Sequence, residues 1–262
     1  MKIWTITKIG IKESLRHRVV YFIFAMAVLF IIMGKGCNPG NIRGNDFLFD
    51  KEAQQSMAMA VAFHSLVFWS IMLCGLVSSA TLSREIEEST AFLTLSRPLS
   101  RSAFIAGKVL SSLILSAFNL FLLGGIFFLL FYSVAGYSNF RIFLSFSFMI
   151  VSLCMYTLMN ILFSLFIPRI ITPLVSSMIY LVTCWAALPF YFTKLRIVWA
   201  PSETVKNIHR FFPGFGDLQF MGASFIESVP AVQNLSGTLC NVFIYCAVFW
   251  FLIAGVFNRR QL

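Results

Sequence analysis

The chain has 262 residues, of which 59% are hydrophobic, 16% are aromatic and only 11% are charged. Soluble domains are about 45–50% apolar and about 25% charged, so a soluble globule of this composition would expose large apolar patches. Intrinsic disorder is also excluded, because disordered chains combine low hydrophobicity with high charge. The class that remains is a polytopic membrane protein.

Charge-free apolar runs mark where the chain can cross a bilayer, since a spanning helix needs about 20 mostly apolar residues. Strands of a membrane barrel would instead show alternating segments of about 10 residues, so these continuous runs predict an all-α fold. The first run, Val19–Gly34, has only 16 residues, and we expect Arg18 and Lys35 to extend it by snorkelling. We expect one transmembrane domain over 1–262, with six transmembrane helices at about 19–34, 56–82, 109–133, 142–167, 171–193 and 236–257.

The distribution of Lys and Arg predicts the orientation of these spans. Six spans place both termini on one side, and 12 of the 20 basic residues lie on that side. Basic residues near span ends favour the cytoplasm, so both termini should be cytoplasmic. The weak point is the basic stretch Lys194–Arg210, which this topology places outside. We assign the formal charge of +10 to contacts with anionic lipid and expect no nucleic-acid partner, because no basic run is interleaved with aromatic residues.

Residues 1–18 have the pattern of a helix that lies in the headgroup region of the bilayer. At 100° per residue, three apolar residues share one side of the helix: Trp4, Ile11 and Leu15. Three basic residues form an adjacent stripe: Lys8, Lys12 and Arg16. An interfacial helix has this combination of apolar and basic sides. The alternative is a cytoplasmic extension of the first span.

The cytoplasmic connection 83–101 is the most informative stretch outside the spans. Acidic residues crowd its first turn, where they suit the positive end of a helix that Ser83 could cap. Phe92 and Leu93 give this expected helix an apolar side, and Pro98 ends it. Such a helix is suited to docking on another protein. The alternative is a solvated loop that only reverses the chain.

The outer segment 194–235 is too long for a tight turn and contains its own aromatic clusters, so we expect it to be ordered. It could lie on the outer leaflet or dip back into it. Within the spans, three residues stand out as polar: His64, Asn119 and Asn160. Polar groups in spans usually bond neighbouring helices, and the sharper hypothesis is that these three line a substrate path.

The sequence has no motif for catalysis or nucleotide binding. It has no GxxxxGK[ST] phosphate loop, no HExxH motif and no GxSxG elbow, and its three His residues are far apart. The predicted spans carry no Asp or Glu, which argues against ion-coupled transport and intramembrane acid–base catalysis. We therefore expect a non-catalytic chain without a metal or cofactor of its own, whose energy comes from another protein.

Residues 84–108, REIEESTAFLTLSRPLSRSAFIAGK, resemble the cytoplasmic segment of ABC type-2 exporter permeases. In that family an acidic pair precedes Gly-Thr, a Leu-rich turn, Ser-Arg-Pro, and a Gly-Lys that opens the next span. The matching residues here are Glu87, Glu88, Thr90, Leu93, Leu95, Ser96, Arg97, Pro98, Gly107 and Lys108. Ser89 departs from the pattern, because the family commonly has Gly there. The N-terminal helix and the tail Phe257–Arg260 are also similar to the family, and the nearest type is the six-span permease of multicopper-enzyme maturation, such as that of nitrous oxide reductase.

The resemblance implies a permease subunit of an ABC exporter in a bacterial or archaeal cytoplasmic membrane. Two permease chains would pair and dock on two ATPase subunits, which would bind ATP and Mg. Segment 84–97 would be the coupling helix seated in a cleft of the ATPase, the N-terminal helix would contact the same ATPase, and residues 197–226 would close the exit. The residues expected to couple are Glu85, Glu87, Glu88, Thr90, Phe92, Leu93, Arg97 and Pro98.

Two other hypotheses stay open at this point. The chain could be a membrane anchor or assembly factor for a periplasmic enzyme that transports nothing. It could also be an integral membrane enzyme, although no polar constellation near a membrane surface supports that. The substrate is not readable from the sequence.

Overall fold

The computed structural model of the chain describes residues 2–15, 18–36, 51–87, 101–135, 139–168, 170–194, 203, 209, 212–226 and 235–259. Throughout these residues the regular structure is helical, which confirms the predicted all-α class. The helices are α1 (Lys2–Ser14), α2 (Arg18–Gly36), α3 (Lys51–Glu87), α5 (Arg101–Ala135), α6 (Asn139–Ser164), α7 (Thr172–Lys194), α9 (Phe215–Ile226) and α10 (Leu235–Arg259).

Five helices in the described residues are long and apolar enough to cross a membrane: α3, α5, α6, α7 and α10. Their apolar stretches run from 18 residues in α7 to 28 residues in α5. The predicted first span falls on α2, whose apolar helical stretch Phe24–Met33 is shorter. The chain therefore has the helices of a multi-pass membrane protein.

Several helices extend well beyond the predicted spans. The clearest case is α3, whose 37 residues make a rod of about 55 Å, against an apolar bilayer core of about 30 Å. A helix continues into water because its backbone bonds are internal, so hydrophobicity marks the membrane crossing and not the helix ends. The expected helix start at Ser83 is wrong for this reason, since α3 runs unbroken through Ser83 to Glu87.

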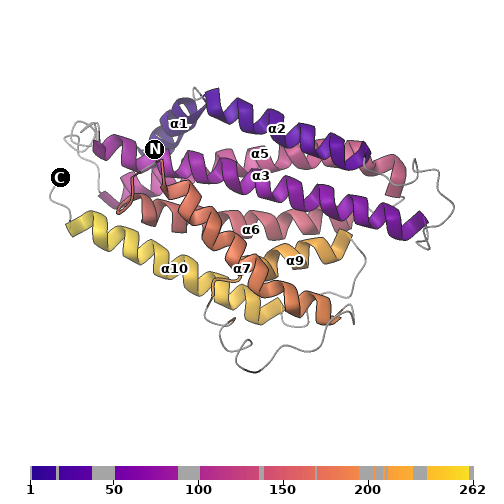
Figure 1. Cartoon of the computed structure of the whole chain (residues 1–262). Coiled ribbons are helices and arrows are strands. Elements are labelled where there is room, and N and C mark those ends of the chain that lie inside the picture. Colours follow the sequence, from indigo (N-terminus) through magenta and orange to yellow (C-terminus); the bar gives the residue numbers. More distant parts are fainter. Residues whose placement is uncertain are drawn as a thin grey trace.

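The long helices form an antiparallel bundle in which successive helices run in opposite directions (Figure 1). The N-terminal α1 and the C-terminal end of α10 lie at the same end of this bundle, where α3 ends and α5 begins. Phe104 near the start of α5 stacks on Phe257 near the end of α10, with ring centroids 6.1 Å apart. The short helix α9 lies toward the other end.

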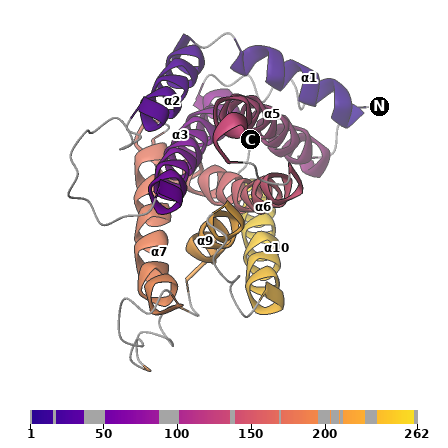
Figure 2. The same cartoon turned by 90° about the vertical axis from the view of Figure 1, so that its right-hand side faces the viewer.

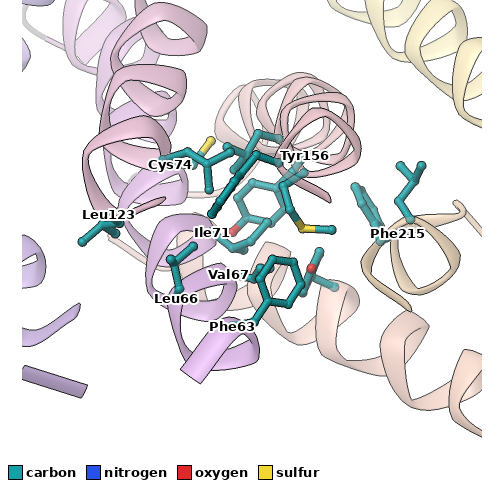
Figure 3. Close-up of a cluster of buried hydrophobic side chains, with 14 of the residues drawn as sticks. Phe63, Leu66, Val67, Ile71, Cys74, Leu123, Tyr156 and Phe215 are labelled. Carbon is teal, nitrogen blue, oxygen red and sulfur yellow. The ribbon is translucent and has the colours of Figure 1, made fainter. Parts of the chain in front are cut away.

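The largest apolar cluster joins α3, α6 and α9 in the middle of the bundle (Figure 3). Phe63, Tyr156 and Phe215 have no exposed surface, and the Tyr156 ring meets that of Phe215 edge-on at 6.3 Å. Burying one such aromatic side chain contributes about 2–3 kcal/mol when water is the alternative, but less in lipid, where close packing holds the helices together.

Helix α9 is only 12 residues long and yet packs against four long helices, mainly α6 and α7 and to a smaller extent α3 and α10. Phe215, Leu218 and Ala223 are at most 1% exposed. Close approach explains the burial: a methyl group on Gly216 would lie 2.6 Å from the backbone oxygen of Thr183 in α7. The hydroxyl of Ser145 in α6 donates to the Gly222 carbonyl at 2.7 Å. This part of the predicted outer segment 194–235 therefore packs inside the bundle instead of lying on its surface.

A candidate functional site in a buried polar seam

A line of hydrogen-bonded polar side chains runs between α3, α6, α7 and α9, and we call it the polar seam. Its members are His64, Ser78, Asn160, Ser176, Tyr180, Cys184 and Gln219. His64 and Ser78 are 14 residues apart on α3, so the seam extends over about 20 Å along that helix. It consists of two hydrogen-bonded groups.

The first group centres on Gln219 of α9. Its carbonyl Oε1 accepts hydrogen bonds from the Tyr180 hydroxyl at 2.8 Å and from the Cys184 thiol at 2.9 Å, both on α7. Its Nε2 lies 2.8 Å from His64 Nδ1 on α3. Because an amide nitrogen only donates, the network assigns a neutral His64 ring with its proton on Nε2. One side chain thus links three helices.

The second group centres on Asn160 of α6, which has no exposed surface. Its Nδ2 donates to the Gly75 carbonyl and to the Ser78 hydroxyl of α3, both at 2.6 Å. Its Oδ1 accepts from the Ser176 hydroxyl of α7 at 2.7 Å. A buried amide with these partners fixes the spacing and rotation of α3, α6 and α7 together.

Tyr156 lies between the two groups. Its ring meets the Tyr180 ring edge-on at 6.0 Å, and its hydroxyl approaches Gly75, whose carbonyl belongs to the Asn160 group. The Tyr156 hydroxyl is buried and has no hydrogen-bond partner among the described residues. A buried hydroxyl without a hydrogen-bond partner among the described residues therefore lies beside the polar seam, between its two groups.

The predicted pathway residues have different fates in the structure. His64 and Asn160 both lie in the polar seam, one in each group. Asn119 lies on α5, is 6% exposed, and its amide nitrogen finds no hydrogen-bond partner among the described residues. Gln219 was missed because it belongs to the predicted outer segment. The sequence did contain one signal for Gln219, because it is the only amide side chain in the apolar stretch Phe215–Ile226.

A second arrangement joins α1 to the beginning of α5, and we call it the α1–α5 junction. The Thr7 hydroxyl donates to the Gly107 carbonyl at 3.2 Å. Gly10 packs so closely on Ser111 that a methyl group there would lie 2.6 Å from the Ser111 oxygen. Lys108, only 3% exposed, lies 3.7 Å from the Glu13 carboxylate. The small face of α1 therefore packs on α5, and beside it a buried Lys108 pairs with a partly exposed Glu13.

The predicted interfacial helix falls on α1. Trp4, Lys8, Lys12 and Leu15 are exposed and Ile11 is half-buried, while Arg16 lies outside the described residues. Of the predicted coupling residues, Glu85 and Glu87 lie on the final turns of α3. The remaining coupling residues lie outside the described residues: Glu88, Thr90, Phe92, Leu93, Arg97 and Pro98.

Comparison with known proteins does not place the chain in a family. No protein-family model matches the sequence. No curated protein matches it either. Within the described residues, no group of three or more His, Cys, Asp or Glu side chains is arranged to hold a metal ion.

The Gln219 group makes a measurable prediction about helix coupling. A double-mutant cycle of His64→Leu and Gln219→Leu should give a coupling energy of about 1 kcal/mol, because each single change breaks the same α3–α9 bond. The measurement is thermal unfolding of the purified chain in detergent. The matched cycle of Gln219→Leu and Asn160→Leu should give a value near zero, since these side chains belong to separate groups. Equal couplings in both cycles would contradict the division of the seam.

Proposed function

We propose that this chain is the transmembrane subunit of an ABC exporter. It forms a translocation path across the cytoplasmic membrane and couples that path to ATP hydrolysis on a separate ATPase chain. In this proposal α2 is the first of six spans, both termini are cytoplasmic, and two copies of the permease dock on two ATPase subunits that bind ATP and Mg.

The observation that carries the proposal is the α1–α5 junction. Gly107 and Lys108 close the segment 84–108 that resembles the exporter permeases, and both residues are held by α1, through Thr7 and Glu13. Helix α1 thus contacts the first two turns of α5, which follow in the chain directly after the segment expected to meet the ATPase. A displacement of the connection between α3 and α5 would move α1 as well, because α1 is packed on the first turns of α5.

The polar seam supports the transport half of the proposal. Its side chains are neutral and form hydrogen bonds across α3, α6, α7 and α9. They can therefore exchange hydrogen-bond partners when the helices move, and no buried ion pair has to be broken. Small rigid-body shifts of packed helices are a common route of conformational change. The seam is therefore a suitable place for a path that opens and closes.

Charge reversal in the coupling segment tests the proposal. The double variant Glu87→Lys/Glu88→Lys should weaken association with the ATPase at least tenfold. The two lysines would repel the basic groups of the ATPase that the acidic side chains are expected to contact. The measurement is the amount of ATPase bearing a phosphate loop that copurifies with the tagged permease in gentle detergent, compared with the unaltered chain.

The matched control is Asp46→Lys/Asp50→Lys, which makes the same charge change in the connection predicted to lie outside. It should leave ATPase recovery unchanged. If the coupling variant keeps full association, the coupling assignment fails. If the unaltered permease copurifies with a periplasmic enzyme and no ATPase, the chain is an anchor and the exporter proposal is wrong.

A further inference from the structure

Helix α1 turns a mixed apolar and basic face away from the bundle, and we call it the outer face. It consists of Trp4, Lys8, Ile9, Lys12 and Leu15, which fall within an arc of about 140° on the helix. Trp4 is 55% exposed, Ile9 is 60% exposed and Leu15 is 39% exposed. The opposite side of α1, formed by Thr7, Gly10 and Ser14, is buried.

The charge of the outer face is positive. Lys8 and Lys12 are both exposed, and the Lys8 ammonium lies 5.9 Å from the centroid of the Trp4 ring. The acid of this helix, Glu13, is directed toward Lys108 at the α1–α5 junction. The ion pair therefore offsets the negative charge of Glu13, and the two exposed lysines keep the outer face positive.

The connection to α2 places this face at the level of the lipid headgroups. Only positions 16 and 17 separate the described end of α1 from α2, which begins at Arg18 and is apolar from Val19 onward. A helix tied so closely to an apolar helix cannot lie far from the membrane surface. Figure 2, seen along the bundle, shows α1 lying across the direction of the neighbouring α3 and α5.

We propose that the outer face of α1 is a binding surface for anionic phospholipid. Lys8 and Lys12 are one turn apart, with their Cβ atoms about 6 Å from each other, so both ammonium groups can reach lipid phosphates. Trp4 and Leu15 on one edge and Ile9 on the other enter the boundary between headgroups and acyl chains, where exposed apolar and indole side chains are stable.

The lipid surface fits better than a protein partner, because the lysines lie between exposed apolar residues on a helix already held at the bilayer. Protein interfaces are instead depleted of Lys. This inference concerns this chain and lipid alone. It competes with the expected contact between the N-terminal helix and the ATPase, and the test below separates the two.

The test uses the full chain in neutral detergent, titrated with phosphatidylglycerol or with phosphatidylcholine of the same acyl chains. Bound lipid is counted by native mass spectrometry. The unaltered chain should retain phosphatidylglycerol preferentially, and Lys8→Gln/Lys12→Gln should lower that apparent affinity about 30-fold. Lys8→Arg/Lys12→Arg should keep the preference, because the charges remain.

The matched control is Lys35→Gln/Lys51→Gln, which removes the same charge at the junction of α2 and α3 at the other end of the bundle. It should lower phosphatidylglycerol retention by much less than Lys8→Gln/Lys12→Gln does, because Lys35 and Lys51 lie on two different helices and do not form a pair one turn apart. The inference is wrong if the unaltered chain does not prefer phosphatidylglycerol, or if both Gln pairs reduce retention equally. It is also wrong if Lys8→Gln/Lys12→Gln releases a copurified protein while lipid retention stays the same, since the outer face would then be a protein contact.

Discussion

Replacing Gly216 by alanine should lower the stability of the protein by about 3 kcal/mol, which corresponds to a fall of about 6–12 °C in the midpoint of thermal unfolding. The added methyl group would lie 2.6 Å from the Thr183 carbonyl oxygen and 2.9 Å from the Cys184 Cα. These are backbone atoms of α7, so no rotamer change can relieve the contact. Helix α9 would have to move away from α7, and the hydrogen bonds of Gln219 to Tyr180 and Cys184 would lengthen.

The control for this prediction is Gly255→Ala in α10. A methyl group there meets no atom within 4 Å among the described residues. Alanine is favoured over glycine in a helix by about 1 kcal/mol, so the same substitution should raise the unfolding midpoint slightly. A Gly216 variant as stable as the Gly255 variant would show that α9 does not pack tightly on α7.

Replacing Asn160 by leucine should destabilise the protein by about 2 kcal/mol, as measured by thermal unfolding in detergent. Leucine has a similar volume but can make none of the three hydrogen bonds that Asn160 shares with Gly75, Ser78 and Ser176. The Ser176 hydroxyl would lose its acceptor on α6. Helices α3, α6 and α7 would lose the group that sets their relative position.

Asn119→Leu makes the same chemical change as Asn160→Leu, but we expect it not to lower the stability of the protein. The Asn119 amide nitrogen is buried and has no hydrogen-bond partner among the described residues, so an apolar side chain removes an unpaired polar group. Stability should stay the same or rise by up to about 1 kcal/mol. A loss of stability as large as that of Asn160→Leu would show that the Asn119 amide has an essential polar contact.

The membrane helices could be predicted from the sequence because the hydrocarbon core of a bilayer excludes charged side chains and forces the backbone to form its own hydrogen bonds. Long charge-free runs have no other stable location, and α3, α5, α6, α7 and α10 each contain one. Helix ends could not be predicted in the same way, since α3 continues past both ends of its apolar run. The apolar stretch of α2 is shorter than a spanning helix needs, and it is the least clear of the predicted spans.

The candidate site was predicted only in part, because the way the helices pack decides which polar side chains meet. His64 and Asn160 stood out as polar residues in apolar runs, but nothing local to them shows which helices they face. The partner of His64 is Gln219 on α9, which lies 155 positions away along the chain. Its burial depends on Gly216 and Gly222, two small residues that allow close approach to α7 and α6. The sequence alone does not show which glycines allow such close approach, because this depends on the neighbouring helix in the folded protein.

The contact between α1 and α5 has a consequence for the order of events during synthesis. Thr7 meets Gly107, which follows it by 100 positions in the chain. At about 5–20 residues per second, a ribosome needs about 5–20 s to cover that interval. Throughout this time the side of α1 that will rest on α5 has no permanent partner. The packing of α1 on α5 is therefore a late step, which can be completed only after the chain has been made through Gly107.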